Sequence, residues 1–511
     1  MVRIPPGQRM LTAHRPPANV AQRERHLVSR PNILFICTDQ QRYDALGCYG
    51  NPDIETPTID RLAADGVLFE QCYVQSPVCA PSRASLVTGQ YVGNHGLWAN
   101  GVALAPHQPI VSRALADSGY DCGMIGKMHL AACFEGRTEP RLDDGYDVYR
   151  WAHDPSHGSP ENDYHRWLRE RHPDVYQRAV GSGPRVRHQP GGFDTVPTEA
   201  HYSRWASERA LEFLDRERDE DDPFFLWVNF YDPHHPFVAP REYLDRYDRD
   251  AVPDPVWFNG ELGTNPPIQR EASAESYAGH ARGFADHSPR EIKEIIAAYY
   301  AMVTLIDDEV KRILDRLDAL GLADDTIVIF TSDHGEMLGD HHLLLKGPML
   351  YDPAVRVPLI LRWPGTLPAG ERRSELVQWI DLTSTFTDVA GLDPMPTAQG
   401  MSLLPLARGD DDAESRGWAL CQYRNSGHPY DPPVHLTMLR AGDHKLVVQH
   451  GPPASTRERT GELYDLARDP DELTNLWDDP EAAGTRIELE RMLLDVLVAT
   501  EDRSQPRTAF W

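Results

Sequence analysis

The chain has 511 residues, 41% hydrophobic and 25% charged, which suits a large α/β domain with a smaller one and excludes disorder throughout. Its 78 acidic and 51 basic side chains leave a net charge of −27, which argues against nucleic acid and anionic membrane surfaces as partners. A small anionic substrate would need a local cluster of positive charge to bind it.

The cysteines and the N-terminal segment predict the compartment. Seven cysteines at irregular spacing do not have the pattern of a disulfide framework. The first 30 residues contain no apolar run of the kind found in a signal peptide, and no later stretch approaches the roughly 20 apolar residues of a membrane span. We therefore expect a soluble, cytoplasmic protein with no membrane partner and a disordered tail over residues 1–30. The sequence leaves the oligomeric state open, a homo-oligomer included.

Ordered structure is expected to begin at Pro31, where the apolar run PNILFICTDQ has the pattern of a strand buried on both faces. A helix is predicted over residues 58–65, with Gly66 placed to end it before the apolar stretch VLFEQCYV. Residues 110–127 repeat this order of amphipathic helix, glycine and short strand, and they end in Lys127.

The second half of the chain continues the alternation. The apolar run that begins at Phe224 ends in the polar string DPHHPF, and a long amphipathic helix is predicted over residues 289–320. The buried strand TIVIFTSDHGE and the run VPLILRWPG follow. This order predicts a mainly parallel sheet covered by helices on both faces, in which ligands bind at the carboxyl ends of strands. Four polar side chains lie at such ends and are expected to converge: Asp39, His234, Asp333 and His334.

Two segments, about residues 134–200 and 240–288, lack periodicity and are too long for plain connections. We expect them to frame the mouth of a pocket and to hold most of the substrate specificity. After about Pro405 a charged linker precedes a predicted antiparallel α+β subdomain with a terminal helix. The expected organisation is thus a tail over residues 1–30, a catalytic domain over 31–405 and a C-terminal subdomain over 406–511.

The string CAPSR begins at Cys79, ahead of a segment able to form a helix. An exposed thiol at a helix N-terminus beside Arg83 would have a lowered pKa and heightened reactivity. The string resembles the C-x-P-S-R signature of the type I sulfatases, in which this cysteine is oxidised to Cα-formylglycine. GYDCGMIGKMH, residues 119–129, resembles a second sulfatase motif, with Cys122 where Ser or Thr is usual. Together with TSDHGEMLGDH and GELYDLARDPDELTNL, these motifs extend the resemblance over most of the chain and imply the alkaline-phosphatase-like fold.

The resemblance implies hydrolysis of a sulfate monoester with formylglycine at position 79 as the nucleophile. Its hydrate is a geminal diol: one hydroxyl, activated by a metal ion, attacks sulfur, and the other expels sulfate as the aldehyde forms again. An unmodified serine or cysteine offers no such route of release. The implied partners are a small anionic sulfate ester and a formylglycine-generating maturation enzyme.

The resemblance also assigns one divalent metal ion. Its implied ligands are Asp39, Gln40, Asp333 and His334, joined by an oxygen of modified Cys79. Oxygen ligands favour calcium, whereas the imidazole also admits manganese or zinc. Gln40 and His334 replace an aspartate and an asparagine of the commonest sulfatase pattern. This exchange resembles the phosphonate monoester and phosphodiester hydrolases, which share the formylglycine, so hydrolysis of their substrates is the alternative function.

Further residues carry over from the family motifs. Arg83 is expected to hold the formylglycine hydroxyls, while Lys127 and His129 of the G-K-x-H string hold the sulfate and the hydrated nucleophile. His234 and Lys346 match the family residues near the leaving-group oxygen, and they are the predicted general acids or leaving-group stabilisers. All five are therefore expected to be catalytic.

Four further positions are weighed by their spacing. Asn100 resembles a pocket asparagine of the phosphonate hydrolases and is expected to bind the substrate, as are Lys127, His234 and Lys346. His235 is excluded, because the pattern selects the histidine two residues before proline. Asp307 and Asp308 occupy adjacent helical positions that point apart, which favours a solvated or capping role. The histidines between residues 153 and 188 follow no ligand template and are interpreted as solvated.

Overall fold

The computed structural model describes residues 30–179, 193–194, 196–451 and 460–501, so the expected tail lies almost entirely outside the described residues. Its main sheet has eight strands in the order β11-β2-β10-β9-β1-β6-β3-β4. The strands are β1 (Asn32–Thr38), β2 (Val67–Tyr73), β3 (Asp121–Gly126), β4 (Val148–Trp151), β6 (Phe224–Asn229), β9 (Thr326–Ser332), β10 (Arg356–Arg362) and β11 (Glu371–Gln378). Only β10 runs antiparallel to its neighbours, β2 and β9, among these described strands.

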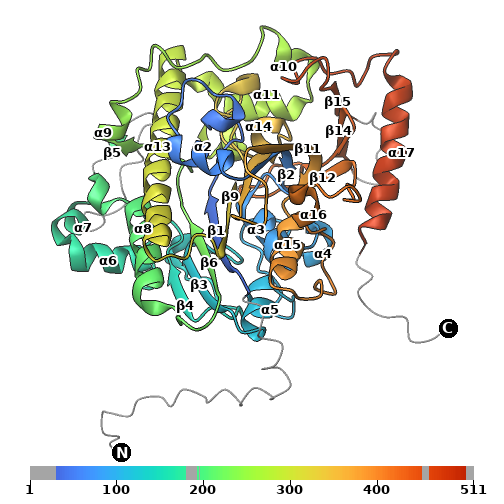
Figure 1. Ribbon diagram of the computed structural model, residues 1–511. Helices are drawn as coiled ribbons and strands as arrows, with labels where there is room; N and C mark the ends of the chain where they lie inside the picture. Colours follow the sequence, from blue (N-terminus) through green and yellow to red (C-terminus); the bar gives the residue numbers. More distant parts are fainter. Residues whose placement is uncertain (1–29, 180–192, 195, 452–459, 502–511) are drawn as a thin grey trace, which may run out of the picture. The chain divides into compact units, whose positions relative to one another are not determined.

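Helices cover both faces of this sheet (Figure 1). Alternate residues of β1 enter two different cores: Phe35 packs into one and Ile36 into the other. One face is covered by α2 (Pro57–Ala64), α8 (Tyr202–Glu212) and α13 (Pro289–Ala319), and the other by α3 (Cys79–Thr88), α5 (Val111–Asp117) and α15 (Asp381–Val389). A capping box of Ser288 and Glu291 begins α13, which matches the long helix predicted from its apolar periodicity.

A second sheet follows in the C-terminal part of the chain. It is antiparallel and contains β12 (Trp418–Arg424), β13 (His435–Ala441), β14 (His444–His450) and β15 (Gly461–Asp465). The helix α17 (Ala483–Ala499) packs on it through Leu489, Leu493 and Val496, which share one helix face. The predicted fold class, a mainly parallel sheet between helices with a smaller antiparallel α+β part, is confirmed.

Short elements fill the two aperiodic segments and the connections. The helices are α4 (Val92–His95), α6 (Asp163–Arg171), α7 (Pro173–Ala179), α9 (Arg241–Leu244), α10 (Glu261–Thr264), α11 (Pro267–Ala274), α12 (Ser276–Gly279), α14 (Asp352–Val355) and α16 (Leu404–Arg408). The short strands are β5 (Phe193–Asp194), β7 (Ala239–Pro240) and β8 (Ala281–Arg282). Helix α16 spans the predicted boundary at residue 405, and the division into domains stays a prediction. Within the described ranges, none of the helices has both the length and the apolar character that a membrane crossing requires.

Candidate active site

The central strands bring two predicted ligands together at their carboxyl ends. Thr38 ends β1 and pairs with Ser332, which ends β9. Asp39 and Asp333 therefore follow directly on two aligned positions, and the N–H of Asp333 donates to the Thr38 carbonyl at 3.2 Å. The expected convergence of these two side chains arises from the parallel pairing of two buried strands.

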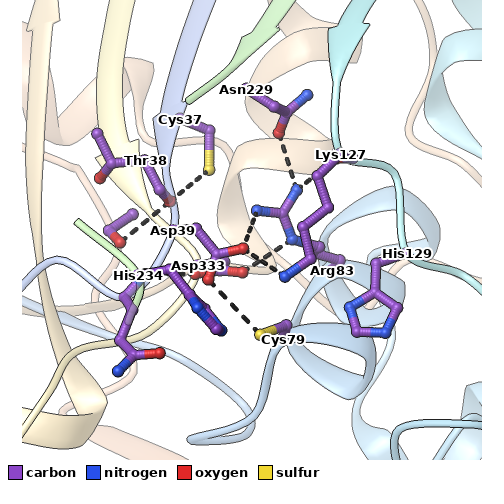
Figure 2. Close-up of polar contacts among 12 residues, drawn as sticks. Cys37, Thr38, Asp39, Cys79, Arg83, Lys127, His129, Asn229, His234 and Asp333 are labelled. Atoms are coloured by element: carbon purple, nitrogen blue, oxygen red, sulfur yellow. Dashed lines mark hydrogen bonds and ion pairs between the residues drawn. The ribbon is translucent and has the colours of Figure 1, made fainter. Parts of the chain in front are cut away.

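Lys127 reaches the same edge from β3. Gly126 ends this strand with a φ of 99°, and a Cβ at this position would collide with the backbone oxygen of Asn229. A glycine is therefore needed where the chain leaves the sheet. Lys127 Nζ donates to Asp39 Oδ2 at 2.6 Å, as Figure 2 shows.

Cys79 enters the site as the first residue of α3. Ser82 Oγ donates to the Asp333 carbonyl at 2.6 Å, which ties the first turn of the helix to the end of β9. The Asn100 side chain accepts from the N–H of Ala80 at 3.1 Å and holds the same turn from the other side. Cys79 is only 1% exposed, so the expectation of an exposed thiol is wrong.

A lysine, a histidine and an aspartate surround the sulfur of Cys79. Its Sγ lies 3.0 Å from Lys346 Nζ and 3.1 Å from His334 Nε2, and Asp39 Oδ1 is 3.6 Å away. Burial raises the pKa of the Cys79 thiol, but the charges of Lys127, Lys346 and His334 and a hydrogen bond from His129 together outweigh burial and hold the pKa well below its usual range. The lowered pKa expected for this thiol is thus present, with the two lysines as its main cause.

Four buried side chains bring ligand atoms within 4.8 Å of one another: Asp39, Cys79, Asp333 and His334. His334 Nδ1 lies 2.9 Å from the Gly335 carbonyl, so Nδ1 carries a hydrogen and Nε2 is the ring nitrogen that faces the cluster. Two carboxylates and an imidazole in this tautomer are a donor set that fits a divalent cation.

Gln40 lies beside this cluster in a left-handed conformation, with a φ of 69°. Its N–H donates to Asp333 Oδ1 at 3.1 Å, and its Oε1 accepts from Lys346 Nζ at 2.7 Å. The other end of the amide, Nε2, donates to the buried carboxylate of Glu336. Sequence reasoning missed Glu336, although it lies two residues after His334 in the same motif.

Arg83 is fully buried and binds both aspartates of the cluster. Its Nε donates to Asp333 Oδ2 at 2.8 Å, and one terminal nitrogen lies 3.3 Å from Asp39 Oδ2. The other terminal nitrogen donates to the Lys127 carbonyl at 2.7 Å and to Asn229 Oδ1 at 2.8 Å. The guanidinium therefore orients the carboxylates and the loop after β3. Asn229, the polar end of β6, was not singled out from the sequence.

His129 is positioned by Glu139, a second buried carboxylate that the motifs did not reveal. Glu139 Oε1 accepts from the His129 N–H at 2.8 Å and from Trp151 Nε1 at 2.7 Å. His129 has a φ of 61°, a region that costs energy for a residue other than glycine, and the bond from Glu139 helps to hold it. Burial lowers the pKa of His129.

His234 and His235 both border the pocket, and their rings stack with centroids 4.0 Å apart. His234 Nδ1 lies 2.7 Å from the His235 carbonyl, so Nδ1 carries a hydrogen, and the ring also has a hydrogen bond with the Cys79 side chain. Burial and the charge of Lys346 lower the pKa of His234. His235, which the pattern excluded, thus lies at the pocket beside the histidine that the pattern selected.

The cavity above Cys79 has a volume of about 530 Å³. Both aperiodic segments contribute to its wall, as predicted, since Phe134, His153 and Asp154 come from the first and Tyr277 from the second. The loop after β12 adds residues 426–428, which the sequence did not associate with the pocket. Other lining residues include Asn100, Lys127, His129, Tyr231, His234 and Lys346. Lys127 and Lys346 form, with Arg83 below them, the local positive cluster that an anionic substrate requires.

The structure tests two further predictions from the sequence, the role of Asp307 and the solvation of the histidines between residues 153 and 188. Asp307 accepts the N–H groups of Thr58 and Ile59 at 3.0 and 2.8 Å in the first turn of α2, which confirms a capping role. The interpretation of the histidines as solvated is wrong for His157 and His165, which are 7% and 4% exposed. Each bonds a backbone carbonyl instead, and His188 lies outside the described residues.

Comparison with known proteins agrees with this geometry. The family model described as Sulfatase matches residues 31–392, and the model described as N-sulphoglucosamine sulphohydrolase, C-terminal, matches residues 339–499. Over 93% of its length the chain is 32% identical to the uncharacterized sulfatase YidJ of Escherichia coli (strain K12), of which 88% is covered. It is 30% identical to an arylsulfatase of Clostridium perfringens (strain 13 / Type A), with 93% of this chain and 95% of that protein covered.

Among solved structures, the phosphonate monoester hydrolase of Agrobacterium radiobacter superposes with a TM-score of 0.79 at 28% identity. The match covers 93% of this chain and 97% of that one. Fold and site together define a hydrolase of the alkaline-phosphatase-like superfamily. Since the family model matches well over half of its residues, the chain belongs to the sulfatase family.

Proposed function

We propose that this protein is a metal-dependent hydrolase that cleaves sulfate monoesters with a formylglycine nucleophile made from Cys79. One observation carries the proposal: the sulfur of Cys79 lies among the ligand atoms of Asp39, Asp333 and His334, all within 4.8 Å. The position that would carry the nucleophile borders a cavity of about 530 Å³ with two lysines in its wall.

The proposed cation would be held by Asp39, Asp333 and His334, with Gln40 and the modified residue 79 completing the set. Carboxylate and amide oxygens favour calcium, and the imidazole makes manganese the alternative. When bound, the cation supplies positive charge against the nonbridging oxygens of the sulfate.

The protein's own groups bind and orient the ester. Lys127 and Lys346 approach position 79 from two elements and would hold the sulfate oxygens by charge-assisted hydrogen bonds. Conversion of Cys79 to formylglycine would place a geminal diol there, in which one hydroxyl attacks sulfur and the other releases sulfate as the aldehyde forms again. Arg83 would keep both aspartates in place by bonds to their Oδ2 atoms.

The leaving oxygen needs a proton or a hydrogen bond. His234 bonds the Cys79 side chain and so lies beside the reacting position, but burial lowers the pKa of His234, and the ring is neutral near pH 7. The ammonium of Lys346 is therefore the proton donor that we favour, and His234 orients the leaving group through Nε2. His129, neutral for the same physical reason, would bond the hydrated nucleophile.

Hydrolysis of a phosphonate monoester or phosphodiester is the second candidate function. Gln40 and His334 favour it, and so does the similarity to the phosphonate monoester hydrolase, whereas Lys127 and His129 of the intact G-K-x-H string favour sulfate. The test is a comparison of rates on an aryl sulfate and an aryl phosphonate monoester with matured protein. We expect the sulfate to be cleaved faster, and a large preference for the phosphonate would overturn the first choice.

The proposal includes two partners, a small anionic sulfate ester and the enzyme that converts Cys79. The seven cysteines all lie within the described residues and form no disulfide there, and the cytoplasmic location stays a prediction. The organisation into a tail, a catalytic domain over 31–405 and a C-terminal subdomain over 406–511 is likewise proposed.

A further inference from the structure

The cluster around residue 79 has different chemistry before and after Cys79 is modified. In the chain as translated, the site holds one sulfur, one imidazole nitrogen and two carboxylate oxygens. Conversion to formylglycine removes the sulfur and leaves nitrogen and oxygen donors only. The two states therefore present donor sets of different softness to a metal ion.

Four of the six distances between the ligand atoms of the unmodified donor set match those of tetrahedral zinc, and the ligand atoms of the four residues all lie within 4.8 Å of one another. Tetrahedral zinc with bonds of about 2.3 Å to sulfur and about 2.0–2.2 Å to nitrogen and oxygen separates its ligand atoms by about 3.4–3.6 Å. Here His334 Nε2 lies 3.1 Å from Cys79 Sγ, 3.7 Å from Asp333 Oδ1 and 3.9 Å from Asp39 Oδ1, and Sγ to Asp39 Oδ1 is 3.6 Å. Each of these edges agrees with the tetrahedron to within about 0.5 Å.

Neighbouring side chains bind the Oδ2 atoms of Asp39 and Asp333, which orients the two carboxylates. The Oδ2 atoms of Asp39 and Asp333 bind Arg83, and Lys127 adds a second bond to Asp39 Oδ2. Asp39 Oδ1 therefore faces the cluster, and Asp333 Oδ1 faces it while also accepting the N–H of Gln40 at 3.1 Å. His334 donates through Nδ1 to a backbone carbonyl, an arrangement that orients ligating histidines in metal sites.

We propose that the unmodified chain is a zinc protein, with Cys79 Sγ, His334 Nε2 and the Oδ1 atoms of Asp39 and Asp333 as its four ligands. On binding, the S–H bond of Cys79 breaks, a sulfur–zinc bond forms, and the proton passes to solvent without any change of oxidation state. A chain that carries formylglycine at position 79 lacks this soft ligand and is expected to prefer a hard cation. This expected change in cation preference rests on the proposed function.

The test uses the full chain produced in a host that lacks the maturation enzyme, stripped of metal with a chelator. Zinc, calcium and manganese are titrated in competition with a chromophoric chelator, and cobalt(II) is titrated by absorption. We expect one equivalent of zinc to bind at least about 100-fold more tightly than calcium or manganese. Cobalt should give the thiolate-to-metal charge-transfer band of the near ultraviolet.

Cys79→Ser should lose the band and weaken zinc binding at least about 100-fold, because oxygen is the harder ligand. Cys37→Ser is the matched control, since Cys37 is also buried and its thiol donates to the Thr38 carbonyl. This variant should keep the cobalt band and the zinc affinity. No band in the unmodified chain, equal binding of zinc and calcium, or a band that persists in Cys79→Ser would overturn the proposal.

Matured protein provides a readout that needs no variant. Its cobalt band should be absent, and a band of unchanged intensity in fully converted protein would also overturn the proposal. Sulfatase activity is measured separately on the matured protein. A zinc-binding unmodified chain whose matured form cleaves no sulfate would refute the proposed function alone, and the reverse result would refute only the zinc site.

Discussion

Replacement of Glu336 by Gln removes one acceptor oxygen from a buried carboxylate that holds two parts of the site. Glu336 Oε2 accepts from Gln40 Nε2, and Oε1 accepts from the N–H groups of Leu338, at 3.0 Å, and of Leu345. Gln40 Oε1 in turn accepts from Lys346 Nζ at 2.7 Å. One carboxylate thus directs the Gln40 amide oxygen toward the lysine and holds both ends of the loop, residues 338–345, that directly precedes this lysine.

Glutamine would offer one oxygen and one amino group to these donors. If the glutamine oxygen accepts the two N–H groups of the loop, the glutamine amino group faces Gln40 Nε2, and two donors then oppose each other. Gln40 must either leave its Nε2 without an acceptor or rotate its amide, which turns Nε2 toward the Lys346 ammonium. A buried unpaired polar group costs about 1–3 kcal/mol, which corresponds to roughly 5- to 150-fold weaker cation binding. Changes behind metal ligands typically cost about 10–100-fold in affinity, in agreement with this range.

The assay is calorimetric titration of the cation into matured Glu336→Gln protein, with kcat and KM measured in parallel. We expect the cation affinity and kcat to fall more than the affinity for substrate. Asp307→Asn is the control, because Asp307 is also a buried carboxylate with two backbone donors, and this change should leave the cation affinity unchanged. An unchanged affinity in Glu336→Gln, or an equal loss in the control, would refute the reasoning.

Cys79→Ala should abolish turnover of an aryl sulfate while the circular dichroism spectrum and the cooperative melt are retained, because the change removes the nucleophile and no core contact of comparable size. Appreciable turnover in that variant would contradict the mechanism. Burial raises the pKa of Asp307 from 3.8 to about 6, so between about pH 4 and 6 the native state keeps a proton that the unfolded chain has released. The free energy of unfolding should therefore fall as the pH rises through this window, by up to about 3 kcal/mol, and Asp307→Asn should lack this part of the dependence. Denaturant titrations from pH 4 to 7 measure it, and identical curves for both proteins would exclude the assignment.

The motif residues were predictable because their signals are local. Asp39 and Asp333 each end an apolar run long enough to be a buried strand, and parallel pairing brings such ends to one edge of a sheet. Cys79 and Arg83 occupy one helix turn, so their spacing alone places both side chains at its start. Where periodicity and strand ends carry the information, the fold class and the candidate site follow from the sequence.

The groups that hold these residues in place were not predictable in the same way. Glu336 and Glu139 are acidic residues in loops, a pattern typical of solvent-exposed positions, and only the packing around them makes each a buried acceptor for several donors. Cys79 was expected to be exposed for the same reason, since a short polar string gives no measure of what covers it. Its lowered pKa then came from Lys127 and Lys346, which approach from other elements.

By itself, the sequence determined the order of strands and helices, the strand ends that carry the ligands, and the string that begins with Cys79, because each depends on neighbours along the chain. Tertiary structure alone decided which loops close the pocket, including the loop after β12, and which carboxylates orient Gln40 and His129. Gln40 and Glu336 lie 296 positions apart, and even Glu139 and His129, only 10 apart, meet through burial and distances that no local pattern contains.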